Sequence, residues 1–217
     1  MSLTDTLKNP LSALTESGLN RYHLDIPSCT AALDVETFTG KEFMSELYYY
    51  QVIFTSSDQN ISSAQLLTKP ATLTMGTGPL MGLAGQKVVH GVVTHFKRIS
   101  GSRDQATYQI IIEPFLSLLR KQFRTHRFFV NKSVPEVVTE VLQEHGLKGW
   151  EYEFTLKSDY PKREQINQYK ESDLAFIERL LAEVGIFTSS PCSRTRKPKW
   201  CTLRTSRVHG PSVKRCL

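Results

Sequence analysis

The sequence predicts a β-rich α+β protein: a flexible leader over residues 1–18, a small antiparallel barrel-like domain over 19–113, an α/β module over 114–187 and a disordered tail over 188–217. Three observations support this prediction. Short segments of alternating or β-branched residues follow one another throughout the second region. Longer segments with helical periodicity occur in the third region. The thirty residues of the tail contain no aspartate or glutamate.

Six strands are expected in the barrel-like domain. The run LYYYQVIF over residues 47–54 is aromatic and β-branched, which favours a well-buried strand. Gly91 lies inside a long strand and predicts a bulge or a sharp barrel bend. Residues 63–67 could form one helical turn, and the glycine-rich residues 76–86 are expected to form a hairpin loop. The expected strands are residues 21–26, 33–38, 47–54, 71–75, 87–99 and 106–113.

The longer helices are expected in the α/β module. Residues 115–121 look helical, and the clearest helix begins at Ser133. Ser133 and Glu136 form a capping-box pattern, Pro135 occupies the first turn, and Gly146 follows the last turn. The apolar residues of this segment recur at helical spacing, so one side of the helix is expected to be buried.

A second helix is expected between Ser172, which can cap its start, and Gly185, which ends it. Residues 150–156 alternate between apolar and polar side chains and predict a strand between the two helices. Ile186 and Phe187 begin another strand, which the residues of the tail are not expected to continue. A tail of this composition buries too little apolar surface to become ordered.

The basic charge of the chain is confined to the tail. The whole chain has 27 basic and 21 acidic residues, for a formal net charge of +6. Eight basic residues lie in the tail, so the remainder has 27 − 8 = 19 basic against 21 acidic residues, a net charge of −2. A nucleic-acid-binding tail stays an alternative, although Trp200 is its only aromatic residue. The basic residues are Arg194, Arg196, Lys197, Lys199, Arg204, Arg207, Lys214 and Arg215.

The first 187 residues suit a reducing compartment. They contain one cysteine, Cys29, and are long enough to fold without disulfides. Residues 1–20 lack the continuous apolar core of a signal peptide. No stretch approaches the roughly 20 apolar residues needed to span a bilayer. The sequence therefore predicts a cytoplasmic protein without a signal peptide or a membrane-spanning segment.

Motifs for catalysis and cofactor binding are missing from the sequence. It contains no G-x-S-x-G elbow, HExxH, Walker loop or CxxC. The glycines of the 76–86 loop do not match G-x-G-x-x-G, because Met81 stands in the place of the third glycine. We therefore predict no catalytic, cofactor-binding or metal-binding residue and no cofactor. The glycines concerned are Gly76, Gly78, Gly82 and Gly85.

Two sets of residues could in principle hold a metal ion, and the pattern argues against both. His90 and His95 share a strand but are separated by an odd number of residues, so an unbulged strand points them to opposite faces. The tail set lacks the short paired knuckle of a zinc site. This second set consists of Cys192, Cys201, His209 and Cys216.

A cluster of acidic residues leaves an enzyme as a further alternative. Paired carboxylates can act as general acid and base where they share a pocket. The simpler interpretation is that Glu171 and Asp173 favour the positive end of the second helix. The cluster consists of Asp159, Glu164, Glu171 and Asp173, with Tyr160 and Tyr169 close by in the sequence.

Specific motifs are spread in order over residues 20–187. The most specific are Tyr160-Pro161-x-Arg163-Glu164 and Gln168-Tyr169-x-Glu171-Ser172-Asp173-x-x-Phe176-Ile177-x-Arg179-Leu180. Others are Leu33-x-Val35-x-x-Phe38-x-Gly40-x-Glu42, His90-Gly91-Val92-Val93-Thr94-x-Phe96, Glu113-Pro114 and Arg127-Phe128-Phe129. Together these motifs resemble the N-terminal hub region of the VgrG family. These are spike proteins of type VI secretion, also found with Rhs elements, and their hub region resembles the baseplate hub of contractile-tailed phages.

The resemblance implies a structural role. In the family the hub is a homotrimer whose barrel-like domains form a pseudo-sixfold ring, and this ring docks on the hexameric tube protein Hcp. The resemblance implies no catalysis in this region, and full-length relatives are exported by the secretion apparatus. The rest of the hub, an oligonucleotide/oligosaccharide-binding-fold domain and a β-helical needle would follow Phe187.

The acid-free tail is typical of out-of-frame translation. Because the family continues into a strand with acidic and aromatic residues at this point, we expect a frame change near codon 188. The expected product is a truncated and impaired fragment of a VgrG-like spike protein.

Overall fold

The computed structural model describes residues 22–43, 46–76, 87–121, 123–147, 152–189 and 201–205. These residues fall into two compact units, and the chain passes from the first to the second between Leu118 and Leu119. That division lies within the 3-10 helix η1 (Phe115–Lys121), which begins directly after Pro114. The expected leader, most of the glycine-rich loop and most of the tail lie outside the described residues.

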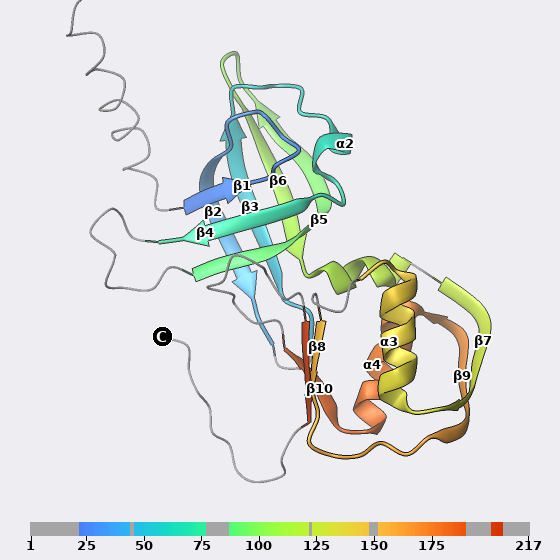
Figure 1. Ribbon diagram of the computed structural model, residues 1–217. Coiled ribbons are helices and arrows are strands. Elements are labelled where there is room, and N and C mark those ends of the chain that lie inside the picture. The colour runs from blue at the N-terminus through green and yellow to red at the C-terminus, as the bar shows by residue number, and fades with distance from the viewer. Residues whose placement is uncertain are drawn as a thin grey trace, which may run out of the picture. The chain divides into compact units, whose positions relative to one another are not determined.

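The first unit is a six-stranded antiparallel sheet with the strand order β1-β4-β5-β6-β3-β2 (Figure 1). The sheet curls until β1 and β2 are neighbours, and the rings of Tyr22 and Phe38 meet edge to face with their centroids 5.0 Å apart. The predicted barrel-like domain is therefore confirmed. Its elements are β1 (Tyr22–Asp25), β2 (Asp34–Lys41), β3 (Tyr49–Ser56), α2 (Ser63–Leu66), β4 (Pro70–Met75), β5 (Lys87–Gly101) and β6 (Ala106–Glu113).

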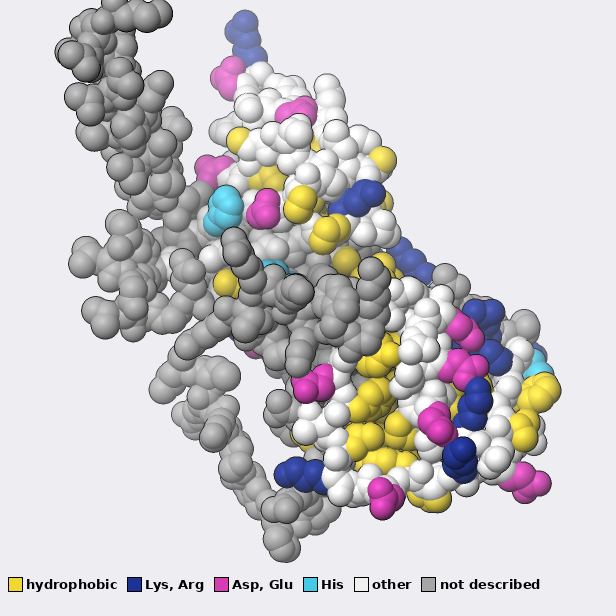
Figure 2. Space-filling view, in the orientation of Figure 1, with side chains coloured by type: hydrophobic (Ala, Val, Ile, Leu, Met, Phe, Trp, Pro, Cys, Tyr) yellow, Lys and Arg dark blue, Asp and Glu magenta, His cyan; other side chains and the backbone are white. Residues whose placement is uncertain are grey.

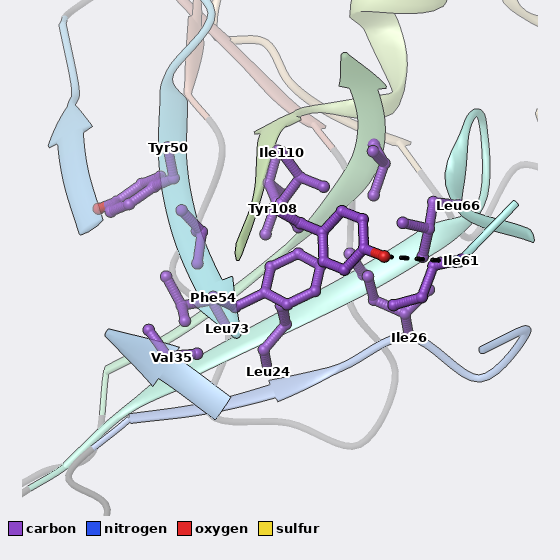
Figure 3. Close-up of a cluster of buried hydrophobic side chains, with 14 of the residues drawn as sticks. Leu24, Ile26, Val35, Tyr50, Phe54, Ile61, Leu66, Leu73, Tyr108 and Ile110 are labelled. Atoms are coloured by element: carbon purple, nitrogen blue, oxygen red, sulfur yellow. Dashed lines mark hydrogen bonds between the residues drawn. The ribbon is translucent and has the colours of Figure 1, made fainter. Parts of the chain in front are cut away.

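The core of the first unit forms where alternate side chains of β3 and β6 point to the inside of the curled sheet. Tyr108 lies between Phe54 and Phe96, with 5.6 Å between ring centroids on each side. Figure 3 shows the Tyr108 ring beside that of Phe54. Its hydroxyl donates a hydrogen bond of 2.9 Å to the backbone oxygen of Asp58 and accepts one of 3.5 Å from the backbone nitrogen of Ile61. The buried tyrosine therefore has both apolar contacts and partners for its polar end.

Gly91 lies where two strands of the sheet approach closely. The long strand β5 pairs with β4 through residues 87–92 and with β6 through residues 92–101, so Gly91 stands beside the point where the pairing changes. The bulge predicted at Gly91 occurs later in β5, between Val93 and His95, with a second irregularity between Arg98 and Ser100. A side chain at Gly91 would overlap the backbone oxygen of Glu113, so glycine is needed here for space.

Replacing Gly91 with alanine is expected to destabilise the first unit by about 1–3 kcal/mol, as overpacking of a well-packed core does. The added methyl group would overlap the backbone of Glu113 and lie 2.7 Å from Cγ2 of Ile112. Urea denaturation followed by circular dichroism measures the effect. Gly101→Ala on the same strand is the control, because the three atoms nearest to the new methyl group all belong to the flexible end of the Arg98 side chain, which can move. Equal stability of the two variants would contradict the prediction.

The second unit combines two helices with two small sheets. The antiparallel strands β7 and β9 form one sheet, and β10, β11 and β8 form the other in that order. The elements are β7 (Phe123–Lys132), α3 (Val134–Glu144), β8 (Tyr152–Thr155), β9 (Arg163–Ser172), α4 (Asp173–Glu183), β10 (Ile186–Ser189) and β11 (Cys201–Thr205). Both predicted helices are present. The sequence pattern also indicates a strand from Gln168 up to the second helix, where β9 ends, but it does not predict β7.

The ends of both helices follow the predicted capping signals. The Glu136 carboxylate accepts hydrogen bonds of 2.7 Å and 2.9 Å from the backbone nitrogen and the hydroxyl of Ser133. The Ser172 hydroxyl accepts a 3.2 Å bond from the backbone nitrogen of Ala175. Gly146 and Gly185 follow the helices with φ angles of 79° and 68°, which glycine adopts without a steric penalty.

The predicted disorder of the tail is wrong for the parts that the structure describes. β10 continues past Phe187 to Ser189, and Cys201–Thr205 form β11, which pairs antiparallel with β10 and parallel with β8. The prediction considered only how much side-chain surface the tail could bury. Strand pairing uses backbone groups that every non-proline residue carries, so a short segment can pair with neighbouring strands whatever the composition around it. The remaining tail residues lie outside the described part.

Candidate functional site

The acidic residues of the alternative enzyme site have separate environments. Asp159 and Glu164 are exposed, and the Glu171 carboxylate pairs with Arg179 at 2.7 Å. Asp173 is fully buried. A hollow of about 550 Å³ does occur in this unit, but none of the four acids lines it. Its lining residues are Pro135, Glu136, Thr139, Glu140, Gln143, Phe154 and Leu156.

Asp173 is the centre of a buried polar network. It occupies the first position of α4, and one carboxylate oxygen lies 2.7 Å from Nε2 of His145, at the end of α3. The other oxygen accepts a 2.7 Å hydrogen bond from the amide of Gln168 on β9. The Gln168 amide also donates to the backbone oxygen of Glu171. The carboxylate thus joins three elements of the unit.

Two arginines of β7 complete the surroundings of this carboxylate. Nε of Arg124 and Nη2 of Arg127 lie 3.8 Å and 3.7 Å from the Asp173 oxygens. Both arginines also pair with Glu144 on α3, and the guanidinium of Arg127 lies over the ring of Phe129. A buried charge is tolerated when paired groups surround it. The geometry therefore assigns Asp173 a structural role in holding β7, β9, α3 and α4 together.

Sequence reasoning placed Asp173 at the start of a helix but missed its partner His145. The available signal was the position of His145 directly before Gly146, because a histidine at the end of a helix favours the negative end of the dipole. That signal does not point to Asp173, which lies 28 residues further along the chain.

A second polar cluster lies in the first unit, at the ends of β2 and β5. The Glu42 carboxylate accepts a 2.6 Å hydrogen bond from Tyr50 and pairs with Lys87 at 2.9 Å. Burial tends to raise the pKa of Glu42, but the bonds from Tyr50 and Lys87 outweigh it and hold the pKa below its ordinary value. The cluster ties together two strands that are not neighbours in the strand order.

His90 and His95 have different partners. Nδ1 of His90 lies 3.0 Å from the Thr72 hydroxyl, and burial lowers the pKa of its ring. Nδ1 of His95 lies 3.2 Å from the Thr94 hydroxyl. The bulge before His95 removes the premise of an unbulged strand, so the parity argument does not apply. Residues 22–43, 46–76, 87–121, 123–147, 152–189 and 201–205 contain no group of three or more metal-ligating side chains.

Several predicted sets of residues fall outside the described part of the chain. The tail residues considered as zinc ligands include Cys192, His209 and Cys216, which lie there. Cys201 is described only as part of β11. Of the basic tail residues, Arg204 alone falls on a described strand. In the helices that the structure describes, none has both the length and the apolar character needed to cross a membrane.

Comparison with known families decides the class of the protein. The family model of the phage tail baseplate hub (GPD) matches residues 41–192, which include most of the barrel-like domain and the α/β module. The chain belongs to the phage tail baseplate hub family. The resemblance to type VI secretion spikes is confirmed as well, because the curated relatives of this hub chain are VgrG spike proteins.

Two of these relatives come from Pseudomonas aeruginosa. The type VI secretion system spike protein VgrG4b is 32% identical over 165 residues, which are 76% of this hub chain and 19% of VgrG4b. VgrG1a is 30% identical over 164 residues, which are 76% of the hub chain and 24% of VgrG1a. The hub chain therefore spans about a fifth to a quarter of the length of these relatives.

A solved structure agrees with the sequence comparison. The E. coli c3393 protein, a component of the type VI secretion system with structural similarity to the T4 bacteriophage tail proteins gp27 and gp5, matches with a TM-score of 0.75 and 36% identity. The match covers 84% of the hub chain and 48% of the c3393 chain. A prophage tail protein from Shewanella oneidensis shares the fold at a TM-score of 0.55 with 12% identity.

Proposed function

We propose that this hub chain is a structural component of a type VI secretion spike, acting as a homotrimer that docks on an Hcp-like tube protein. The family match over residues 41–192 carries this proposal, together with the curled six-stranded sheet of the first unit. The buried Asp173 network supports it, because that carboxylate is occupied by partners within the protein. We expect no cofactor to take part.

Docking is tested by mixing the purified full chain with assembled rings of an Hcp-like protein and separating the mixture by size with light scattering. We expect a complex whose mass corresponds to one ring and three hub chains, because the proposed hub is trimeric. A tube protein from an unrelated system serves as the control. Failure of the hub chain to co-migrate with any Hcp ring at physiological salt would argue against the proposed function.

We also propose a frame change near codon 188, which would leave an impaired product. The acid-free composition of residues 188–217 supports this frame change. Disorder of the tail does not support it, because Cys201–Thr205 form a strand. Reading the other two frames after codon 187 of the gene tests it. A continuation rich in acidic and aromatic residues in another frame is expected, and two frames without such a continuation would reject the frame change.

A further inference from the structure

The small sheet of the second unit has a space for one strand between β8 and β10. The strand order β10-β11-β8 places β11 between two strands that do not pair with each other. Figure 1 shows β11 as the red strand of this sheet. Neighbouring strands lie roughly 4.8 Å apart, so about 10 Å separates β8 from β10. We call the space between β8 and β10 the strand slot.

The strand slot pairs with both edges of its occupant. Residues 201–204 of β11 lie opposite residues 152–155 of β8 in a parallel register. Residues 202–205 lie opposite residues 189–186 of β10 in an antiparallel register. The three central residues of β11 therefore have a partner strand on each side. Main-chain hydrogen bonds supply the affinity when an extended segment adds to a sheet, and the strand slot offers two such ladders.

One wall of the strand slot, β8, is attached to α3. Tyr152 of β8 is buried, and the amide of Gln143 on α3 donates a 3.4 Å hydrogen bond to its hydroxyl. Phe154 of β8 and Leu156 just beyond it line the hollow of about 550 Å³ together with residues of α3. Figure 2 shows hydrophobic side chains gathered at this face of the second unit. These contacts of β8 involve no residue of β11.

The other wall, β10, is attached to α4. Gly185 ends the helix with a φ angle of 68°, and β10 begins at the next residue, Ile186, which is buried. β10 contacts α4, and α4 contacts α3. The 2.7 Å contact between His145 and Asp173 also joins the two helices. The helices therefore hold both walls at their spacing through contacts that do not involve β11.

The connection between β10 and β11 is longer than their pairing requires. Hairpins join antiparallel neighbours through about two to five residues. Eleven residues, 190–200, separate Ser189 from Cys201 in this chain. Fully extended, a segment of that length reaches up to about 36 Å, at roughly 3.3 Å per residue. A connection of this length allows β11 to leave the strand slot without stretching the chain.

We propose that the strand slot is a binding site for one extended peptide segment, and that β11 occupies it as an internal ligand that a separate peptide of the same sequence can replace. Pairing through the main chain requires an extended backbone with free N–H groups, so a proline at the centre of the ligand is excluded. Main-chain pairing also accounts for a segment of the acid-free tail completing the sheet. Peptide binding at this slot goes beyond docking on a tube protein and does not depend on it.

The full chain and two variants at the centre of β11 test this proposal. Leu203→Pro removes a backbone N–H from the middle of β11 and should release the strand from the slot. Leu203→Ala is the matched control, because it shortens the side chain but keeps the N–H. The ligand is a fluorescein-labelled synthetic peptide of residues 199–207, with serine in place of Cys201 to prevent disulfides. Fluorescence anisotropy measures its binding, and circular dichroism shows whether each variant is folded.

We expect the peptide to bind Leu203→Pro at least about tenfold more tightly than the original chain or Leu203→Ala, in which the tethered β11 competes at an effective concentration of about a millimolar. The same peptide with proline in place of Leu203 should not bind. Equal affinity for Leu203→Pro and the original chain, or binding of the proline peptide, overturns the proposal. So does a Leu203→Ala variant that binds as tightly as Leu203→Pro, because the side chain would then hold β11. Unfolding of the second unit in Leu203→Pro also overturns it, because the walls would then depend on β11.

Discussion

Replacing Asp173 with alanine is expected to lower the free energy of unfolding of the second unit by about 3–5 kcal/mol. The carboxylate is fully buried and accepts or shares hydrogen bonds with His145 and Gln168. Its removal would leave the Gln168 amide without one acceptor and Arg124 and Arg127 without a nearby negative charge on this side. Breaking one side of a buried charge network costs more than the net contribution of the pair, because the remaining polar groups stay buried.

Urea denaturation followed by far-ultraviolet circular dichroism measures this change. Asp159→Ala is the control, because Asp159 is exposed and its replacement should stay within about 0.5 kcal/mol of the original chain. Asp173→Asn keeps the shape and one oxygen acceptor, so we expect an intermediate loss. If Asp173→Ala unfolds at the same urea concentration as Asp159→Ala, the network does not stabilise the unit, and a catalytic role for Asp173 would have to be reconsidered.

Replacing Phe54 with alanine is expected to destabilise the first unit by about 3–5 kcal/mol, the usual cost of emptying a large aromatic site in a core. Phe54 is completely buried on β3 and stacks on Tyr108 of β6 (Figure 3). Its loss would remove apolar burial and leave one side of the Tyr108 ring without contact. Because adjacent strands carry these two rings, the cavity would weaken their pairing as well.

Two further variants separate packing from other effects. Phe43→Ala removes the same side chain at a position that is 56% exposed, and we expect it to change stability by no more than about 0.5 kcal/mol. Tyr108→Phe retains the stacked ring but removes the hydroxyl that bonds to Asp58, so a loss of about 1 kcal/mol is expected. A larger loss in Tyr108→Phe than in Phe54→Ala would show that hydrogen bonding, and not packing, dominates this core.

Local sequence patterns predicted much of the fold. The apolar run over residues 47–54 corresponds to β3, and the capping pattern at Ser133 marks the start of α3. Strand alternation and helical periodicity indicate which side of an element is buried. They therefore predict the element without knowledge of the residues that it packs against. The predicted strand over residues 150–156 likewise contains β8.

The strand β7 and the first half of β9 escaped prediction for a physical reason. The segments Phe123–Lys132 and Arg163–Ser172 carry charged residues at both ends, and left-handed residues Asn131 and Lys170 interrupt their alternation. Their pairing joins residues about forty positions apart, as between Arg127 and Gln168, and local patterns contain no record of such a partner. The order of β11 escaped for a related reason, because pairing with β10 on one side and β8 on the other stabilises it.

By itself, the sequence determined the family, the curled β-rich first unit and both capped helices, because these depend on the order of apolar residues and on capping within a few positions. The tertiary structure decided that Asp173 is a buried carboxylate that links two helices, since its partner His145 lies at the end of the other helix. It also decided that the charged ends of β7 and β9 point to the helices. Such outcomes depend on which distant groups meet, and only the folded chain brings those groups within bonding distance.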